Sequence, residues 1–527
     1  MMKPSLLRWA SAALAGVWMA ASNAALSAPT APSLLPLARV QVRLPSGPTH
    51  STVVADLSCP SVATPSAVAS RAARPAAPPA SDPLDIPDAD SVAASLRDLA
   101  RDAANGNPLA FAPAQDRLDD VLRGLTAGRR TPLRVAIWGD SHLAAGFFTD
   151  TLVRQTGLPP ERVQASFLPG SINRPGIRLP LRRSCLSAGW RHEPGYLSGN
   201  GTAPGPGLVN LSTSEAGSWL ALDLRNAAGQ PERRPLRLLY QQTPTPIQLA
   251  ISLDGGQEYM IELPGGPAGP AALDLLRDTP VTQLRLRLLQ GALRWHGLAF
   301  GAAPAGASPA LILDVFGYPG ATANAWRQAD LAYLGNWFQD TRYDVVMLEY
   351  GTNEGNVRSL DGPTYQQNLR QAVGKLRTLF PQAACVLIAP GDRGTLVRRG
   401  SAGSEDLLRF SRIHADIGRL QHQVAQDFGC KVWSMQTAMG GLGSAYQWVR
   451  QTPALMARDL IHFSVPGYQQ LARQFFSELG WDRVDWARVG IAAPALAEVE
   501  ATDAVALSAS QAASGLTPEG TSASQVQ

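Results

Sequence analysis

Residues 133–142 read Leu-Arg-Val-Ala-Ile-Trp-Gly-Asp-Ser-His, and the fold class can be inferred from this stretch. Its first six residues are almost all apolar, which is typical of a strand that is covered on both faces. A helical pattern follows, so Ser141 stands where a strand ends and a helix begins. In open α/β folds, ligands bind at this edge of the sheet. The stretch therefore predicts an α/β domain with Ser141 at its ligand-binding edge.

Four more short apolar runs follow along the chain, with helical patterns between them. They lie at residues 311–316, 344–350, 384–389 and 430–434, and the last helical pattern covers residues 468–479. Alternating strands and helices indicate a parallel sheet layered between helices. We therefore predict a sheet of five parallel strands.

A long interval interrupts this alternation. About 170 residues separate the first predicted strand from the second, whereas a crossover unit needs about 30. Within the interval, residues 247–253 and 284–288 alternate apolar and polar positions, as half-buried strands do. Residues 219–224 and 293–300 are further candidate strands. We predict an antiparallel β-sandwich over residues 181–305, inserted between the first two strands of the α/β domain.

The N-terminus has the three parts of a secretory signal peptide. Lys3 and Arg8 precede an apolar stretch at residues 9–21, and small residues lead up to Ala24. We predict a signal peptide over residues 1–24, cleaved after Ala24. The apolar stretch is shorter than the about 18 to 20 residues of a membrane-spanning helix. We therefore expect a periplasmic or secreted protein with no stable membrane span after cleavage; a retained anchor is the alternative.

Composition indicates how the rest of the chain is divided. The 527 residues include 48 Gly and 42 Pro, too many for one compact helical protein. Residues 25–88 are rich in Ala, Pro and Ser and predict a disordered tether, and residues 497–527 predict a disordered tail. The α/β domain is then split between residues 89–180, which begin with a helical lead-in, and residues 306–485. With 46 basic and 42 acidic side chains, the net charge of +4 indicates no surface for nucleic acid.

The four cysteines are Cys59, Cys185, Cys385 and Cys430. In an oxidising compartment they can form two disulfides, with three pairings open. Cys385 and Cys430 each lie in an apolar run, where a reduced cysteine also packs well as a small hydrophobe. The sequence therefore assigns no pairing.

Ser141 lies at the positive end of the predicted helix, a suitable place for a nucleophile. The alternative is a helix cap, which serine commonly provides. A nucleophilic serine needs a base with an orienting partner, and Asp459-Leu460-Ile461-His462 stands directly before the last predicted helix. This spacing lets Asp459 hold one nitrogen of His462 while the other faces Ser141. A capping aspartate beside a structural histidine is the alternative.

Acyl transfer also requires hydrogen-bond donors for the developing oxyanion. The second predicted strand leads into Gly-Tyr-Pro-Gly-Ala at residues 317–321, and the third into Glu-Tyr-Gly-Thr-Asn-Glu at residues 349–354. The candidate donors are the backbone N–H groups of Ser141 and Gly320 and the side chain of Asn353, although each segment alone is also an ordinary turn. The chain has no zinc-type ligand spacing, and we expect neither a metal nor an organic cofactor.

Taken together, these motifs resemble the four blocks of the SGNH hydrolases, also called the GDSL esterase and lipase family. The matching residues, in chain order, are Ser141, Gly320, Asn353 and His462, with Asp459 as the triad acid. The resemblance spans about residues 131–482 without the insertion. It implies a flavodoxin-like α/β fold with a parallel five-stranded sheet between helices, and a serine esterase that works through an acyl-enzyme.

Gly-Asp-Ser-His, Gly-Thr-Asn-Glu and the β insertion resemble the peptidoglycan O-acetylesterase branch of that family. Its members are periplasmic and remove O-acetyl groups from glycan strands, and their inserted module resembles a carbohydrate-binding domain. Pro319 departs from the branch pattern, which favours asparagine there, and this departure bears on substrate preference. Trp190, Trp219 and Trp295 in or beside the insertion could stack on sugar rings or form the core of the sandwich.

These observations predict a secreted serine esterase that removes O-acetyl groups from cell-envelope polysaccharide such as peptidoglycan. One alternative is a polysaccharide O-acetyltransferase that uses the same triad. The other is a non-catalytic envelope protein whose insertion binds polysaccharide. The expected partner is a polysaccharide or another acylated substrate, and the sequence does not indicate an oligomeric state.

Overall fold

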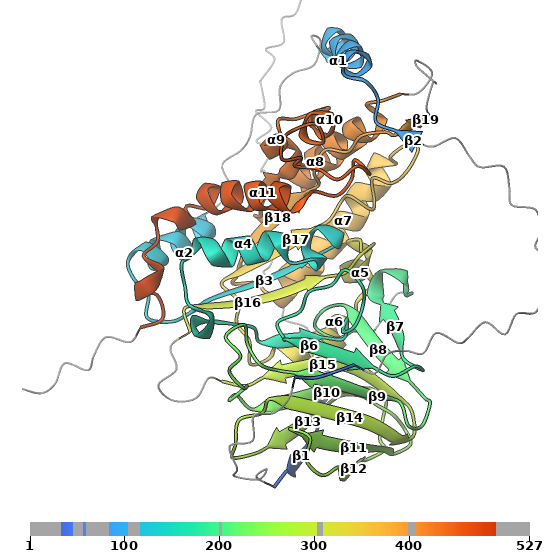
Figure 1. Cartoon of the computed structure of the whole chain (residues 1–527), viewed down its shortest axis with the longest axis vertical. Coiled ribbons are helices and arrows are strands. Elements are labelled where there is room, and N and C mark those ends of the chain that lie inside the picture. The colour runs from blue at the N-terminus through green and yellow to red at the C-terminus, as the bar shows by residue number, and fades with distance from the viewer. Residues whose placement is uncertain are drawn as a thin grey trace, which may run out of the picture.

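The computed structural model has an α/β part and a β part, which lie next to each other in Figure 1. The predicted signal peptide at residues 1–24 and the predicted tail at residues 497–527 lie outside the described residues. The structure describes residues 33–45, 56–59, 84–103, 116–199, 203–302, 309–398 and 406–491.

A six-stranded parallel sheet forms the centre of the α/β part, in the order β20-β18-β17-β3-β16-β4. Its strands are β3 (Leu133–Gly139), β4 (Val163–Gln164), β16 (Leu311–Gly317), β17 (Val345–Glu349), β18 (Ala384–Ala389) and β20 (Lys431–Ser434). All five predicted runs form strands of this sheet. The predicted number of five was wrong, because the two-residue strand β4 pairs with β16 and adds a sixth. So short a strand leaves no apolar pattern to recognise.

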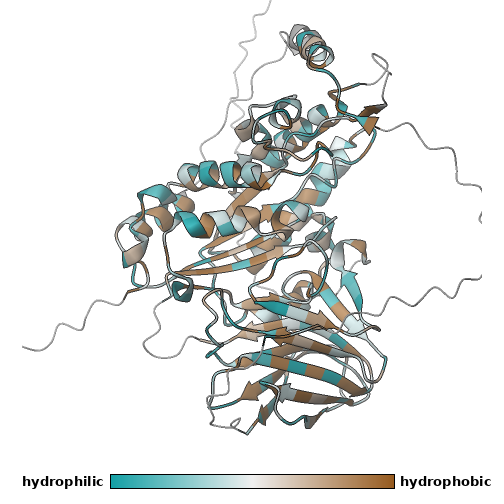
Figure 2. Cartoon of the chain, viewed as in Figure 1, coloured by the Kyte–Doolittle hydropathy of each residue, from teal (hydrophilic) through white to brown (hydrophobic). Residues whose placement is uncertain are grey.

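Helices cover both faces of this sheet. Successive residues of each strand point to opposite faces, so the apolar side chains of one strand pack against both layers of helices. In β17, Val345 and Met347 share an apolar cluster with α2, α4 and α11, whereas Val346 and Leu348 share one with α5, α7 and α8. Figure 2 shows the strands as mostly hydrophobic and the surrounding helices as mixed. The α-helices are α1 (Ala89–Ala103), α2 (Asp116–Thr126), α3 (Ser141–Ala144), α4 (Phe147–Gln155), α5 (Asn324–Gln328), α6 (Leu331–Leu334), α7 (Gly362–Leu379), α8 (Arg409–Phe428), α9 (Met435–Met439), α10 (Ser444–Trp448) and α11 (Val465–Glu478).

The β part is a sandwich of two sheets with an apolar core between them. The antiparallel strands expected in the insertion are present, and Leu284, Leu286 and Leu288 of β14 are fully buried in that core. One sheet contains β1 (Ala38–Arg43), β13 (Gly269–Leu276), β10 (Leu236–Gln242), β15 (Leu293–Phe300), β8 (Val209–Thr213) and β7 (Arg191–Pro194), with β5 (Phe167–Pro169) beside β15. The other contains β12 (Tyr259–Leu263), β11 (Ile247–Leu253), β14 (Gln283–Gln290), β9 (Trp219–Asp223) and β6 (Arg183–Leu186).

Two segments outside residues 181–305 also belong to the sandwich. Strand β5 precedes the predicted insertion, and β1 lies within residues 25–88, which were predicted to be a disordered tether. That prediction was wrong for β1, which pairs in parallel with β13. The six residues of β1 alternate between half-buried and exposed, as expected of a strand at the edge of a sheet. The residues around β1 have the composition of a linker, which is why this strand was not predicted. A second piece of the same stretch, β2 (Leu84–Asp85), pairs with β19 (Val397–Arg398).

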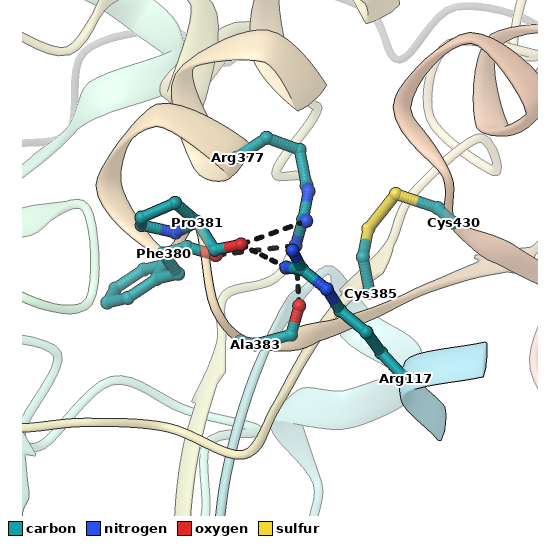
Figure 3. Close-up of a disulfide and its surroundings, with 7 residues drawn as sticks. All are labelled: Arg117, Arg377, Phe380, Pro381, Ala383, Cys385 and Cys430. Carbon is teal, nitrogen blue, oxygen red and sulfur yellow. Dashed lines mark hydrogen bonds between the residues drawn. A yellow bond between two sulfur atoms is a disulfide. The ribbon is translucent and has the colours of Figure 1, made fainter. Parts of the chain in front are cut away.

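Two disulfides connect the four cysteines, Cys59 with Cys185 and Cys385 with Cys430. The first attaches residues from the predicted tether to β6 of the sandwich. The second joins β18 to the residue before β20, and both of its cysteines are buried (Figure 3). Beside it, the guanidinium of Arg377 donates to the carbonyl of Ala383 at 2.6 Å, which fixes the chain that enters β18. The pairing left open by the sequence is thus Cys59–Cys185 and Cys385–Cys430.

Within the described residues, no helix combines the length and the apolar character needed to span a membrane.

Candidate active site

The candidate site lies where three neighbouring strands of the parallel sheet end. Gly139 of β3 is in register with Gly317 of β16 and with Glu349 of β17, so these strands end at one level. Ser141, Gly320 and Asn353 follow these ends directly. The parallel register therefore gathers three of the predicted site residues at one edge.

Ser141 and His462, 321 positions apart, are in hydrogen-bond contact. The Ser141 hydroxyl lies 3.0 Å from Nε2 of His462, and Nδ1 of His462 lies 2.7 Å from Oδ2 of Asp459. Helix α3 begins at Ser141, but its cap is Asp140, whose carboxylate accepts a hydrogen bond from the N–H of His142 at 2.9 Å. The alternative in which the Ser141 side chain serves as the helix cap was wrong, and its hydroxyl is directed at the imidazole.

A tight turn holds the Asp459 carboxylate against the His462 ring. Leu460 is buried and adopts a left-handed conformation with φ of 57°, which returns the chain on itself. Oδ1 of Asp459 consequently accepts hydrogen bonds from the N–H groups of Ile461 and His462, both at 2.9 Å. Helix α11 is capped by Ser464 instead. The carboxylate thus orients the ring and does not cap the helix.

These contacts shift the pKa values of both partners. Partial burial raises the pKa of Asp459, but the hydrogen bonds from the ring and N–H of His462 and from the N–H of Ile461 outweigh it and lower the pKa to about 2. The hydrogen bond from Asp459 raises the pKa of His462, although partial burial of the ring opposes this shift. The pair is therefore an ionised carboxylate beside an imidazole of increased basicity.

Gly320 and Asn353 belong to loops that are hydrogen-bonded to each other and to the Ser141 segment. Nδ2 of Asn353 donates to Oδ2 of Asp140 at 3.1 Å and to the carbonyl of Ala321 at 2.9 Å. Gly320 has a φ of +83°, a conformation that favours glycine. Both amide hydrogens of Asn353 are engaged in this structure, so an oxyanion would have to replace one of these acceptors.

Two buried carboxyl groups and a half-buried one, none of them singled out from the sequence, lie next to these loops. Asp140 and Glu349 are fully buried, and the N–H of Asp140 donates to Oε2 of Glu349 at 3.1 Å. Burial raises the pKa of both groups, and the nearby Asp140 charge raises that of Glu349 further. Glu354 accepts hydrogen bonds from the N–H groups of Ala323 and Gly351, which connect the second and third loops. The only signal in the sequence was a glutamate within the otherwise apolar run at β17.

The β part contributes one side of the site. Tyr196, in a short 3-10 helix (Gly195–Leu197), has its hydroxyl 3.1 Å from the position that a Cβ at Gly320 would take. Its ring centroid lies 6.3 Å from that of Tyr318, and the guanidinium carbon of Arg174 lies 5.8 Å from the Tyr318 centroid. Asn324 of α5 donates to the carbonyl of Tyr196 at 2.9 Å, which connects the two parts of the protein.

The three tryptophans considered for sugar stacking differ in exposure. Trp295 is fully buried in the core of the sandwich, so it is not available to a sugar. Trp190 and Trp219 are half-buried neighbours, and the indole N–H of Trp190 donates to the carbonyl of Trp219 at 3.1 Å.

The described part of the chain contains no group of three or more His, Cys, Asp or Glu side chains arranged to hold a metal ion. His142, next to Ser141, is buried, and burial lowers its pKa to about 3. Its Nδ1 lies 3.2 Å from the hydroxyl of Tyr468, so the ring is a neutral packing element behind His462.

A family model described as the GDSL-like lipase/acylhydrolase family matches residues 288–470. This part of the chain is therefore similar to hydrolase domains of the SGNH/GDSL family. The match includes Gly320, Asn353, Asp459 and His462 but not Ser141, which the long insertion separates from them in sequence.

The fold is similar to that of a solved peptidoglycan O-acetylesterase structure, with a TM-score of 0.52 and 20% identity over 70% of this chain and 96% of that one. A putative GDSL-like lipase from Parabacteroides merdae ATCC 43184 matches with a TM-score of 0.25 and 18% identity, over 32% of this chain and 73% of that one. A family two carbohydrate esterase from Cellvibrio japonicus matches with a TM-score of 0.23 and 12% identity, over 58% of this chain and 98% of that one. A search of the curated proteins found no match.

Proposed function

We propose that this protein is a secreted serine esterase that removes O-acetyl groups from cell-envelope polysaccharide, with peptidoglycan as the substrate. The observation that carries the proposal is the hydrogen-bonded chain from Ser141 through His462 to Asp459 at the edge of the parallel sheet. Candidate oxyanion donors adjoin it, and the β part reaches the same edge through Tyr196. The fold shared with a peptidoglycan O-acetylesterase supports the choice of substrate.

In the proposed reaction, the Ser141 hydroxyl attacks the carbonyl carbon of the acetyl ester while Nε2 of His462 accepts its proton. Asp459 stabilises the resulting imidazolium through Nδ1. Collapse of the tetrahedral intermediate breaks the bond to the sugar oxygen, which leaves with the proton from His462. Water, deprotonated by His462, then attacks the acetyl-serine and releases acetate and free Ser141.

The negative charge of each tetrahedral intermediate requires donors already in place. The N–H groups of Ser141 and Gly320 and the amide of Asn353 are the proposed donors. The carboxylate of Asp140 accepts a hydrogen bond from Nδ2 of Asn353 and also caps the start of α3, where Ser141 lies. One carboxylate thus positions both the proposed oxyanion donor Asn353 and the nucleophile Ser141. Asp140 is in this proposal a positioning residue that does not contact the substrate.

Acetate release from O-acetylated peptidoglycan tests the proposed function. We expect the full-length protein to release acetate at a rate well above that of a Ser141→Ala control, with a preference for the polymer over a small aryl acetate. Release no faster than the control would contradict the proposal. Transfer of the acetyl group to an added glycan, without free acetate, would instead identify an O-acetyltransferase.

The pH dependence of the reaction follows from the state of His462. Only the neutral ring accepts a proton, so kcat/KM is expected to rise with pH and to reach half of its plateau above 6.5, the ordinary pKa of histidine, because Asp459 raises the pKa of His462. Replacing Asp459 with asparagine removes the largest cause of this shift and should move the midpoint to lower pH. A rate that stays constant from about pH 5 to 8 would contradict the assignment of His462 as the base.

A further inference from the structure

Arg393, on the segment that follows β18, is a half-buried cation with no ion pair within the described parts of the chain. Its Nη2 donates to Oδ1 of Asn356 at 3.1 Å, and its guanidinium carbon lies 4.0 Å from the ring centroid of Phe410. Its Nε is buried and has no hydrogen-bond partner among the described residues. The guanidinium thus packs with one face on the Phe410 ring, and its Nε–H group forms no hydrogen bond within the described residues.

The segment that carries Arg393 is firmly held on both sides of it. The buried carboxylate of Asp392 accepts hydrogen bonds from the Ser411 hydroxyl, from Nε2 of Gln436 at 2.7 Å and from the N–H of Ala445 at 2.8 Å. The N–H of Thr395 donates to the Tyr446 hydroxyl at 2.7 Å. The guanidinium is therefore pre-organised, which reduces the entropy lost when it binds a ligand.

The same segment packs against the turn that carries the triad. The N–H of Gly394 donates to the carbonyl of Leu460 at 3.1 Å, and a Cβ at Gly391 would come within 2.5 Å of the Phe463 ring. Burial lowers the pKa of Arg393 and the charge of Asp459 opposes this shift, while the charge of Arg393 offsets part of the rise in the pKa of His462 that Asp459 causes. Arg393 and Asp459 do not form an ion pair; the carboxylate of Asp459 is paired with His462 and accepts hydrogen bonds from the N–H groups of Ile461 and His462.

Asp459 acts on this half-buried guanidinium only through space, so a carboxylate in direct contact with it would stabilise it further. The planar N–H donors of a guanidinium match the two oxygens of a carboxylate better than the donors of any other side chain do. We propose that Arg393 binds a carboxylate on the sugar whose ester is cleaved, so that the enzyme selects O-acetyl groups on acidic glycans. This inference rests on the proposed esterase function and adds to it the charge of the substrate.

Two substrates with the same ester test the inference: an O-acetylated sugar acid with a free carboxylate and the methyl amide of the same compound. We expect the unmodified enzyme to cleave the carboxylate with a kcat/KM about 10- to 100-fold higher, the range for a hydrogen bond to a charged group. Arg393→Gln should abolish this preference by lowering kcat/KM for the carboxylate far more than for the amide. Arg393→Lys, which retains the charge but loses the planar geometry, should retain part of it.

The half-buried Arg370 of α7, paired with Asp427, provides a control with the same change of charge. Arg370→Gln should retain the full preference. Equal rates on both substrates with the unmodified enzyme would overturn the inference and leave the esterase function intact, and this comparison needs no variant. An equal loss on both substrates in Arg393→Gln would also overturn it, because a cation that only tunes the triad affects every ester alike. No cleavage of either substrate would contradict the esterase function itself.

Discussion

Ser141→Ala is expected to lower kcat for ester hydrolysis by at least about 10⁴-fold. In the proposed mechanism the Ser141 hydroxyl is the protein group that forms a bond to the acyl carbon, and it contacts His462 directly. The variant should fold, because Asp140 caps α3 and the serine side chain has no other hydrogen bond within the described residues. Rates on an aryl acetate and on O-acetylated peptidoglycan, with a thermal unfolding curve for each protein, measure the effect.

A serine-directed fluorophosphonate provides an independent readout of the same prediction. The unmodified protein should gain one label, located on Ser141 by peptide mass spectrometry, and Ser141→Ala should gain none. Unchanged hydrolysis by a folded Ser141→Ala protein would refute the mechanism. A non-catalytic polysaccharide-binding protein would show neither hydrolysis nor labelling.

Most of the fold could be predicted from apolar periodicity. The central strands β3, β17 and β18 of the parallel sheet are buried on both faces, and such strands read as continuous apolar runs. The strands that were missed have weak patterns for physical reasons. Strand β4 has only two residues, and β1 is a half-exposed edge strand within a linker-like composition. Edge strands of this kind are defined by their pairing partners, which the local sequence does not contain.

The candidate site was predictable to the extent that sheet topology determines it. Residues that follow neighbouring parallel strands meet at one edge, and this rule alone brings Ser141, Gly320 and Asn353 together. Tyr196 and Arg393 could not be predicted, because they come from the insertion and from a loop whose course depends on tertiary packing. Burial of Glu349 likewise follows from three-dimensional packing, and no residue spacing indicates it.

Asn353→Ala is expected to lower kcat by about 10² to 10³-fold with little change in KM. An oxyanion donor acts mainly on the tetrahedral intermediate, so its loss affects the chemical step and leaves substrate binding almost unchanged. In this structure Nδ2 of Asn353 bonds Oδ2 of Asp140 and the carbonyl of Ala321, and an oxyanion would compete for one of these hydrogens. Steady-state kinetics on a small acetate ester, combined with thermal unfolding, separate the effects.

The unfolding measurement decides between a donor and a purely structural role for Asn353. If Asn353 only connected the loops, its loss would lower the unfolding temperature and weaken substrate binding together with turnover. If it donates to the oxyanion, the protein should unfold at nearly the same temperature while kcat falls. An unchanged kcat in Asn353→Ala would leave the N–H groups of Ser141 and Gly320 as the only proposed donors, and Asn353 would then serve to hold Asp140 in place.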